Sequence, residues 1–327
     1  LVHYWVEDAN HAKNYVSYAR RDSLKSGGVI IDTVSVSSKG YIGDNSIWVT
    51  ANPKIDGKQQ DQFEQFYFNN FTQKTFSVTK DNTNPILDVT FDGIHILDED
   101  IVSPVPLISI TLDDENEFLL LNEDLDTTLF KIQLIRPNSN TPEPLFFSNN
   151  GESGYLMWEP AIDDKNLFKI EYNPIFTEDG VYTLMVQGSD KSNNFSGDFS
   201  YEISFEVITA STITHLFNYP NPFSTKTHFV FTLTGSEVPD QMLIQIMTVT
   251  GKVVREISMD EIGPLRIGNN KTDFFWDGRD QFGDQLANGV YLYRAIVKLN
   301  GENIDHRGTS ADTKSFKKEF GKMYLLR

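Results

Sequence analysis

The feature that most constrains this chain is an alternation of apolar and polar residues with a period of two. In "YEISFEVI" (201–208), aromatic and aliphatic side chains at every second position are separated by glutamate and serine. Because successive side chains of an extended strand point to opposite faces, this pattern predicts a half-buried strand. The runs "FVFTL", "VYTLMVQG", "GVYLYRAIV" and "GVIIDTVSV" are similar and rich in the β-branched and aromatic residues that favour strands.

Turn signals such as "SSKG", "FDG", "EDG" and "SNN" recur between these runs. No long stretch keeps a helical period, and "DQFEQFYF" and "AKNYVSYARRDSLK" are expected to form a turn or two of helix at most. Many short strands with regular turns predict an all-β protein of tandem immunoglobulin-like antiparallel β-sandwiches. We expect three of these domains, at 1–83, 84–209 and 210–327, and the first of them to be incomplete at its N-terminus. The links between the domains are short and polar, so we expect them to allow only limited freedom.

Composition excludes several classes of function. The formal net charge of −18 argues against nucleic acid and anionic membranes as partners. The 327 residues include no cysteine, which rules out disulfides, thiolate metal sites and a cysteine nucleophile in this chain. No apolar run approaches the roughly 20 residues of a membrane-spanning helix. The start "LVHYWVEDANH" lacks the features of a signal peptide, so we expect a fragment or processed product of an exported bacterial protein.

The segment "WDGRDQFGDQLANGVYLYR" (276–294) combines a tryptophan with closely spaced turn residues. We expect Trp276 to fill a sandwich core, Asp277 and Gly278 to start one turn, and Asn288 and Gly289 to form another that leads into a strand at 290–297. In the upstream "YPNPF", two prolines fix the backbone before what we expect to be the first strand of the domain, and their aromatic neighbours flank the sheet edge. Gly251 in "TVTGKVVREI" is expected at a tight turn between two strands.

The order "YPNPF… TGKVVREI… WDGRDQFGDQLANGVYLYR" resembles the immunoglobulin-like domain of the flagellar hook-capping protein. The same pattern recurs at the C-terminus of proteins exported by the type IX secretion system of Bacteroidetes. The resemblance covers about the last third of the chain and implies an export and surface-anchoring signal. It departs from many such signal domains, because "LNGENIDHRGTSADTKSFKKEFGKMYLLR" adds a loop and a final strand.

The upstream residues resemble the C-terminal region of gingipain-type cysteine peptidases, a family that includes the type IX sortase. "NPILDVTFDG" and "YNPIFTEDGVYTLMVQGSDKSNN" are similar to the module that precedes the signal domain there. "FEQFYFNNFTQKTFSV" is similar to the last strands of cell-adhesion-type modules, with Asn69 and Asn70 at the family's paired asparagines. The Cys–His dyad of the family has no counterpart, so this chain is expected not to be an enzyme.

The resemblance implies recognition of the last domain by an outer-membrane β-barrel component of the type IX secretion machinery, and a location at the cell surface or outer membrane. The residues we expect to serve recognition and fold there are Tyr219, Pro220, Asn221, Pro222, Phe223, Gly251, Trp276, Asp277, Gly278 and Gly289. The chain is thus expected to be a non-catalytic module with two upstream domains as a stalk. Accessory domains of an upstream peptidase and a carbohydrate-binding or adhesive stalk are the alternatives.

One acidic run offers a candidate metal site. Calcium prefers six to eight oxygen ligands, and adjacent carboxylates near a domain joint supply some of them. The candidates are Asp113, Asp114, Glu115 and Glu117, with Asp190 from "GSDKSNN". The spacing of an EF-hand is missing, and acidic loops of an acidic protein are more often simply solvated, so no cofactor is the default expectation, with calcium as the alternative.

Other catalytic and binding signatures are absent from the sequence. The six histidines form no HxxH or HExxH pair, and there is neither a GxSxG elbow nor a GxxxxGK[ST] phosphate loop. Trp48 and Trp158 fall in strand-like runs, and we interpret them as core side chains in preference to sugar platforms.

Overall fold

The computed structural model describes residues 1–20, 25–38, 40–54, 63–148, 154–162, 165–306 and 320–327. Strands dominate this part of the chain, and helical structure is confined to two short elements, the 3₁₀ helix η1 (Asp124–Leu129) and the helix α1 (Met259–Ile262). The chain separates into two compact units, Leu1–Asn82 and Thr83–Arg327. The all-β prediction is confirmed.

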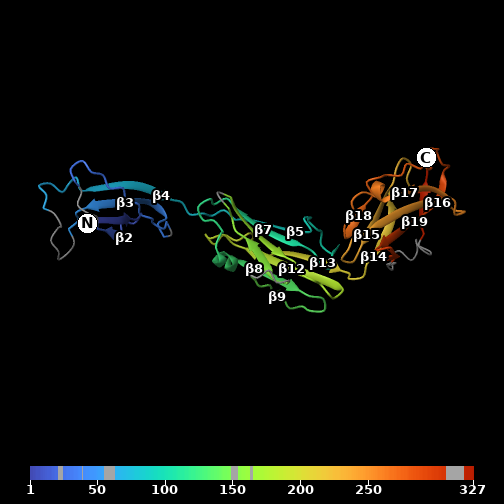
Figure 1. Ribbon diagram of the computed structural model, residues 1–327, viewed down its shortest axis with the longest axis horizontal. Coiled ribbons are helices and arrows are strands. Elements are labelled where there is room, and N and C mark those ends of the chain that lie inside the picture. Colours follow the sequence, from blue (N-terminus) through green and yellow to red (C-terminus); the bar gives the residue numbers. More distant parts are fainter. Residues whose placement is uncertain (21–24, 39, 55–62, 149–153, 163–164, 307–319) are drawn as a thin grey trace. The chain divides into compact units, whose positions relative to one another are not determined.

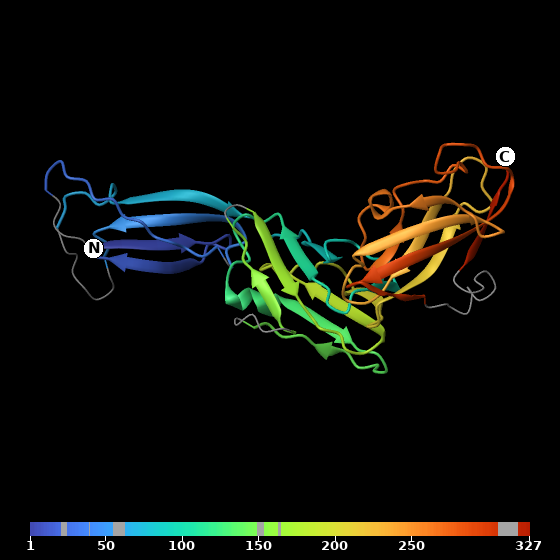
Figure 2. The ribbon, with the colours of Figure 1, turned by 45° about the vertical axis from the view of Figure 1, so that its right-hand side comes forward.

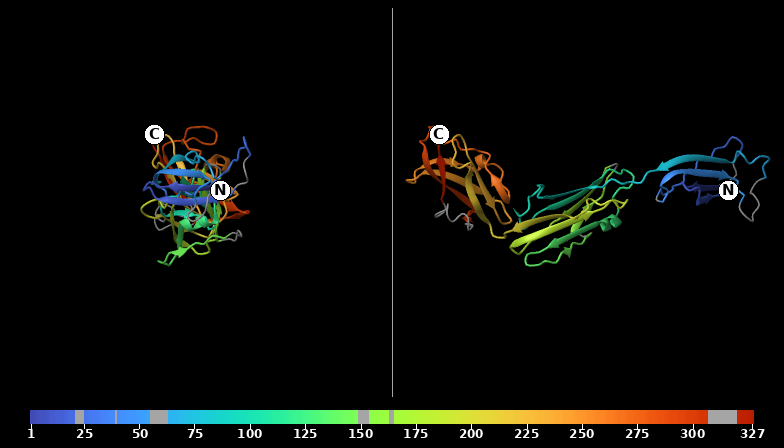
Figure 3. Two further views of the ribbon diagram at one scale, coloured as in Figure 1. Left: turned by 90° about the vertical axis from the view of Figure 1, so that its left-hand side faces the viewer. Right: turned by 180° about the vertical axis from the view of Figure 1, so that it is seen from behind.

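The first unit contains one four-stranded antiparallel sheet among its described residues, in the order β2-β1-β3-β4 (Figure 3). Its strands are β1 (Val2–Glu7), β2 (Lys13–Ala19), β3 (Gly43–Ala51) and β4 (Phe71–Val78). The strand expected at 28–36 is wrong: these residues pair with no neighbouring strand, and Ile31 is 91% exposed. Alternation alone does not make a strand, because a strand also needs ladder hydrogen bonds to a partner strand, which these residues do not form.

The middle sandwich packs two sheets, visible as the green layers in Figure 1. One sheet has the order β10-β11-β7-β5 and the other β6-β13-β12-β8-β9. Their strands are β5 (Ile86–Phe91), β6 (Asp100–Val102), β7 (Ile108–Asp114), β8 (Phe130–Ile135), β9 (Glu143–Pro144), β10 (Leu156–Glu159), β11 (Asn166–Tyr172), β12 (Gly180–Gly188) and β13 (Tyr201–Val207). The alternation in β13 works as expected, since Ile203, Phe205 and Val207 join the core while the residues between them do not.

The last sandwich, in yellow to red in Figure 2, also has two sheets. The orders are β18-β15-β14-β21 and β17-β16-β19-β20, and β22 pairs with β19 as well. The strands are β14 (Thr212–Tyr219), β15 (His228–Leu233), β16 (Gln241–Thr248), β17 (Val253–Ile257), β18 (Gly268–Lys271), β19 (Gly289–Leu299), β20 (Glu302–Asn303), β21 (Asp305–His306) and β22 (Gly321–Leu325). Most pairs are antiparallel, whereas β21 runs parallel to β14 and β6 parallel to β13.

The expectation that the prolines lead into the first strand of this domain is wrong. Strand β14 precedes them, because "TITHLFNY" already forms a strand that buries Ile213 and Leu216 in the core, with a bulge in its register between Thr214 and Phe217. The link between the two sandwiches is hydrogen-bonded to residues of both of them. Asp179 Oδ1 accepts hydrogen bonds from the backbone and hydroxyl of Thr209 at 2.8 and 2.7 Å, and the Thr234 hydroxyl donates to the Ala210 carbonyl at 2.6 Å.

A buried histidine makes the stability of the first unit depend on pH. The His3 ring is 6% exposed and stacks on Tyr15 and Tyr18, with centroids 5.0 and 4.3 Å away. Burial, and secondarily the positive charge of Lys13, lower the pKa of His3 below its ordinary value of 6.5. The folded unit therefore binds fewer protons than the unfolded chain below that pH, and its stability falls as pH falls.

We expect amides of β1 and β2 to lose protection when the pH drops from about 7.5 to about 5.5, because protonated His3 favours the unfolded chain. Hydrogen–deuterium exchange, corrected for the intrinsic pH dependence of exchange, measures this. A His3→Phe variant keeps the aromatic stack and removes the titrating group, so its protection is expected to change less. Equal pH dependence in both proteins would contradict the assignment.

Candidate recognition site around the C-terminal strand

The final strand β22 is built into the core of the last sandwich. It pairs along one edge with the beginning of β19, from Gly289↔Leu325 to Tyr293↔Gly321. Met323 and Leu325 are fully buried, while Tyr324 and Leu326 are 45% and 54% exposed. The period-two pattern of "GKMYLLR" thus places two apolar side chains inside the sandwich and presents their neighbours outside it.

The other edge of β22 is covered by the "YPNPF" turn. The Asn221 side chain acts as a substitute strand: its Nδ2 donates to the Lys322 carbonyl at 3.0 Å and its Oδ1 accepts from Tyr324 N at 3.0 Å. Phe223 continues the pairing through its backbone, which accepts from Leu326 N at 2.9 Å and donates to the Tyr324 carbonyl at 3.0 Å. Both edges of β22 are therefore hydrogen-bonded over its last residues.

A second asparagine repeats this arrangement at the chain end. Asn288 Nδ2 donates to the Arg327 carbonyl at 3.1 Å, and Asn288 Oδ1 accepts from Arg327 N at 3.1 Å. The Arg327 guanidinium also donates to the Asp277 carbonyl. The sequence marked Asn288 only as a turn residue before Gly289, because nothing in a single sequence shows that the turn meets a strand 39 positions later.

The turn itself is held from inside the sandwich. The Pro220 carbonyl accepts hydrogen bonds from the Thr227 hydroxyl at 2.8 Å and from Asn218 Nδ2 at 3.2 Å. The Tyr219–Pro220 and Asn221–Pro222 peptide bonds are both cis. Phe223 is 3% exposed and belongs to the core, whereas Tyr219 is 68% exposed. The two aromatic residues that flank the prolines therefore have different roles, one for packing and one at the surface.

Trp276 connects the turn to the core, as expected. Its ring is 1% exposed and lies 5.5 Å from the rings of both Phe223 and Tyr291. The indole Nε1 donates to the Arg279 carbonyl at 2.7 Å, so the polar atom of this buried ring is satisfied. The backbone of Trp276 exchanges hydrogen bonds with Thr227 at 2.8 and 2.9 Å, which aligns the tryptophan with the base of the turn.

The remaining signature residues shape nearby turns. Asp277 Oδ1 accepts from Arg279 N at 3.1 Å, and Gly278 has a φ of 77°. A Cβ on Gly278 would come within 2.8 Å of Leu325 and of the Arg327 side chain, so this glycine also permits the close approach of the chain end. Gly251, with a φ of 86°, turns the chain from β16 into β17, and Gly289 begins β19. Of the ten residues singled out, only Gly251 lies outside the surroundings of β22 and the beginning of β19.

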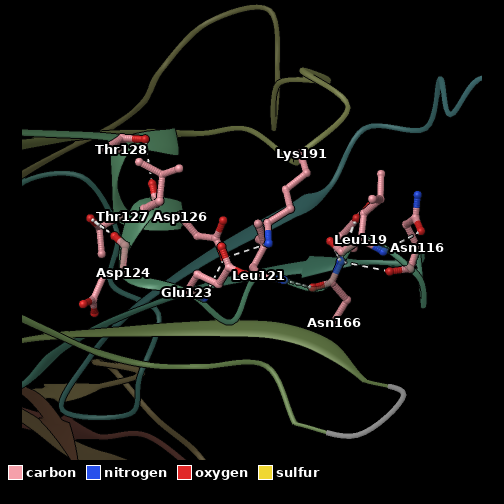
Figure 4. A network of polar contacts seen from close by, with 12 residues as sticks. Asn116, Leu119, Leu121, Glu123, Asp124, Asp126, Thr127, Thr128, Asn166 and Lys191 are labelled. Carbon is pink, nitrogen blue, oxygen red and sulfur yellow. Dashed lines mark hydrogen bonds and ion pairs between the residues drawn. The ribbon is translucent and has the colours of Figure 1, made fainter. Parts of the chain in front are cut away.

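The acidic run lies at one end of the middle sandwich, where Asn166 organises a network of backbone contacts (Figure 4). Asn166 Oδ1 accepts from Leu121 N at 2.8 Å, and its Nδ2 lies within hydrogen-bond distance of Asp114 Oδ2 at 2.9 Å and of the Asn116 carbonyl at 3.0 Å. Asp114 is 4% exposed, and its carboxylate lies within 4.8 Å of that of Glu115. Buried Asp114 thus has a structural role in joining β7 to the following loop.

The other candidate calcium ligands are engaged or separate. Both oxygens of Asp190 accept hydrogen bonds from Asn194, one from the backbone and one from the side chain, each at 2.7 Å. Next to Asp190, Lys191 pairs with Asp126 Oδ2 at 3.1 Å and so places a cation in this region. Among the described residues, neither Asp113, Glu117 nor Asp190 belongs to a cluster of three potential metal ligands. The calcium site remains a prediction.

Trp48 and Trp158 are both half-buried and neither is a fully enclosed core side chain. Trp48 stacks on Trp5 with centroids 5.1 Å apart, and its Nε1 donates to Glu7 Oε2 at 3.0 Å. Trp158 packs against the core of the middle sandwich from its edge strand.

No family model matches the chain, and no curated protein matches it. Solved structures that match the chain include dimeric latent PorU from Porphyromonas gingivalis, which is 17% identical at a TM-score of 0.29 over 86% of this chain and 24% of that one. The C-terminal domain of the antigen I/II-family protein AspA from Streptococcus pyogenes is 8% identical at a TM-score of 0.24, over 76% of this chain and 100% of that one. Chicken CNTN1 FN1-FN3 domains are 8% identical at a TM-score of 0.23, over 100% and 90%.

The chain thus spans about a quarter of the PorU chain that it matches. Within the described residues, no helix is long and apolar enough to cross a membrane.

Replacing Asn221 with alanine removes both side-chain hydrogen bonds to β22. The Lys322 carbonyl and the Tyr324 N–H then lose their partner and must bond to water instead. We expect the last sandwich to lose about 1–3 kcal/mol of its free energy of unfolding. Urea unfolding combined with hydrogen exchange of the β22 amides measures this. Asn303→Ala, at an exposed strand position of the same sandwich, is the matched control and is expected to change little. Equal effects of the two substitutions would show that the Asn221 contacts do not secure the strand.

Calcium at millimolar concentration is expected to leave the melting midpoint of the chain unchanged, because Asp190 and Asp114 already accept protein hydrogen bonds. Differential scanning calorimetry with calcium and with chelator measures this. A midpoint that rises by several degrees with calcium, and no longer does so after Asp114→Asn, would establish the site.

Proposed function

We propose that this chain is a non-catalytic module of a large exported surface protein, and that residues 210–327 are its recognition handle for type IX secretion and surface anchoring. One observation carries the proposal. Nearly all residues that resemble the secretion-domain pattern converge on the C-terminal strand β22, where they fix its position and leave Tyr219, Tyr324 and Leu326 exposed. The pattern therefore specifies one particular presented surface in addition to a stable sandwich.

The pairing of β22 limits how a partner binds. Strand addition needs a free edge, but β19 and the Asn221–Phe223 segment occupy both edges of the last residues of β22. The partner, an outer-membrane component of the secretion machinery, therefore binds the turn at Tyr219 and the outward-pointing side chains of β22. Acidic and basic residues are nearly balanced in 210–327, so this contact relies on shape and apolar surface more than on charge.

The upstream sheets have a mechanical role in this proposal. Residues 1–209 contain 33 acidic and 14 basic residues, a net charge of −19, which keeps a surface module soluble and discourages binding to other anionic surfaces. The tied link at Thr209 and Ala210 restricts the freedom of the handle relative to the sandwich before it. We propose that this part acts as a stalk.

Deletion of Leu216–Arg327 from the parent protein, expressed in a bacterium with a type IX system, is expected to retain the protein inside the cell envelope. Surface protease accessibility and fractionation measure its location. Normal appearance of the truncated protein at the surface would refute the handle.

A double substitution separates recognition from folding. Tyr219→Ala with Leu326→Ala removes exposed side chains, so we expect an unchanged melting midpoint and at least several-fold less surface protein. Phe282→Ala, at a residue that is 90% exposed in the same sandwich, serves as the control and is expected to be exported normally. Normal export of the double variant would place recognition elsewhere on the domain.

A further inference from the structure

The edge of the middle sandwich carries an aromatic stack whose outer ring is Trp158. The Phe168 ring lies between two others: Phe130, at a centroid distance of 5.0 Å and an interplanar angle of 20°, and Trp158, at 5.2 Å and 12°. Phe168 is fully buried. Trp158 comes from the edge strand β10, opposite Ile170 of β11, and is only half-buried. One face of its indole therefore rests on Phe168, and the opposite face is directed away from the stack.

A pocket of about 240 Å³ lies beside Trp158, lined also by Phe147, Asp124 and Thr127. Phe147 packs against the same core and is joined by its backbone to Leu156 of β10. Asp124 and Thr127 come from the 3₁₀ helix η1, shown in Figure 4. Aromatic rings thus come from the sheet edge and polar side chains from the helix.

The helix η1 is held firmly in place, so the polar groups of the pocket are preorganised. Glu123 and Asp126 form a reciprocal capping box, and Asp126 is 4% exposed and paired with Lys191 at 3.1 Å. The Thr127 hydroxyl donates to the Asp124 carbonyl at 2.7 Å, which leaves the hydroxyl oxygen available as an acceptor. Preorganised groups lose less conformational entropy when a ligand binds.

Two strong hydrogen-bonding groups of the pocket are uncommitted. Within the described part of the chain, neither the Asp124 carboxylate nor the Trp158 Nε1–H has a protein partner. A carboxylate accepts hydrogen bonds from hydroxyl groups, and the indole N–H donates one. The pocket therefore combines an aromatic face with one charged acceptor and one donor at its rim.

We infer that this pocket binds one ring of a neutral or amino pyranose, as a carbohydrate subsite of the middle sandwich. The axial C–H groups of a pyranose form a weakly positive apolar face that complements the negative face of an indole ring. The hydroxyls around the sugar edge supply the polar partners for Asp124 and Trp158 Nε1. The volume lies below the roughly 300–1,000 Å³ of pockets that enclose drug-sized ligands, and so suits a single ring.

Charge narrows the class of sugar. Asp124 places an anion at the rim, and the chain as a whole has a net charge of −18. Uronic and sialic acids would bring a second carboxylate next to Asp124, which is unfavourable. An acidic peptide is disfavoured for the same reason, and a neutral hydroxylated ring or an aminosugar meets no such penalty.

The other aromatic group of the chain is a poorer candidate. On the sheet of the first unit, the Trp5 and Trp48 rings stack on each other, and Lys13 Nζ lies 4.2 Å from the centroid of Trp5. His3 likewise stacks on Tyr15 and Tyr18, whose ring centroids lie 6.2 Å apart. The faces that Trp5 and Trp48 turn toward each other are not available for stacking on a sugar.

Affinity electrophoresis of the full 327-residue chain in gels containing hydroxyethylcellulose, yeast mannan or glycol chitin tests the subsite, with polygalacturonate as the anionic comparison. We expect at least one neutral polymer to retard the chain and polygalacturonate not to do so. Asp124→Ala is expected to weaken binding about ten-fold, because hydrogen bonds to a charged group are worth more than neutral ones. Asp124 is an exposed residue, so this variant is expected to fold normally.

Trp158→Ala is expected to abolish retardation, and its melting curve shows whether the sandwich remains folded. Trp158→Phe keeps a ring on Phe168 but loses the N–H, so intermediate binding is expected. Phe199→Ala, at a residue that is 87% exposed in the same unit, is the matched control and is expected to bind like the parent chain. No retardation by any neutral polymer, or equal retardation of the Asp124, Trp158 and Phe199 variants, would overturn the inference, as would preferential binding of polygalacturonate.

Discussion

The last sandwich depends on the placement of its final strand. Met323 and Leu325 are fully buried, and they complete a core that also contains Trp276 and Phe223. A short strand at a chain end frays readily unless it is tied down. Here Asn221 and Asn288 each pair both polar atoms of a side-chain amide with the backbone of the chain end. Burial supplies the stabilising energy, and the two amides fix the register.

This arrangement explains why the "YPNPF" and "WDG" motifs occur in the same domain although Phe223 and Trp276 are 53 positions apart in the sequence. The Phe223 and Trp276 rings are in contact, and Thr227 hydrogen-bonds with the backbone of Trp276 and with the Pro220 carbonyl. Both motifs contact the chain end that contains β22. The surface that we propose as the recognition site is thus assembled from three distant segments, and only the folded domain presents it.

In the middle sandwich, the hydrogen-bond network that holds the helix η1 lies next to the pocket beside Trp158. Asn166 and Asp126 satisfy buried polar groups around the loop that follows β7 and thereby fix η1. The Asp124 carboxylate on the same helix accepts none of these hydrogen bonds, and Asp124 lines the pocket beside Trp158. Binding sites generally require side chains that are held in place by the residues around them.

The sequence by itself determined the strand content, the alternation of buried and exposed residues, and the core position of Trp276. These properties follow from local chemistry: period-two patterning, β-branched residues and turn residues act over a few positions. It misjudged residues 28–36, which alternate but have no strand partner, and it placed the first strand of the last sandwich after the prolines when β14 precedes them. Only the tertiary structure decided that Asn221 and Asn288 hold β22, that Asp190 bonds to Asn194, and that Trp158 lies beside Asp124. Contacts between residues far apart in the chain depend on which strand edges meet, and no local pattern encodes that.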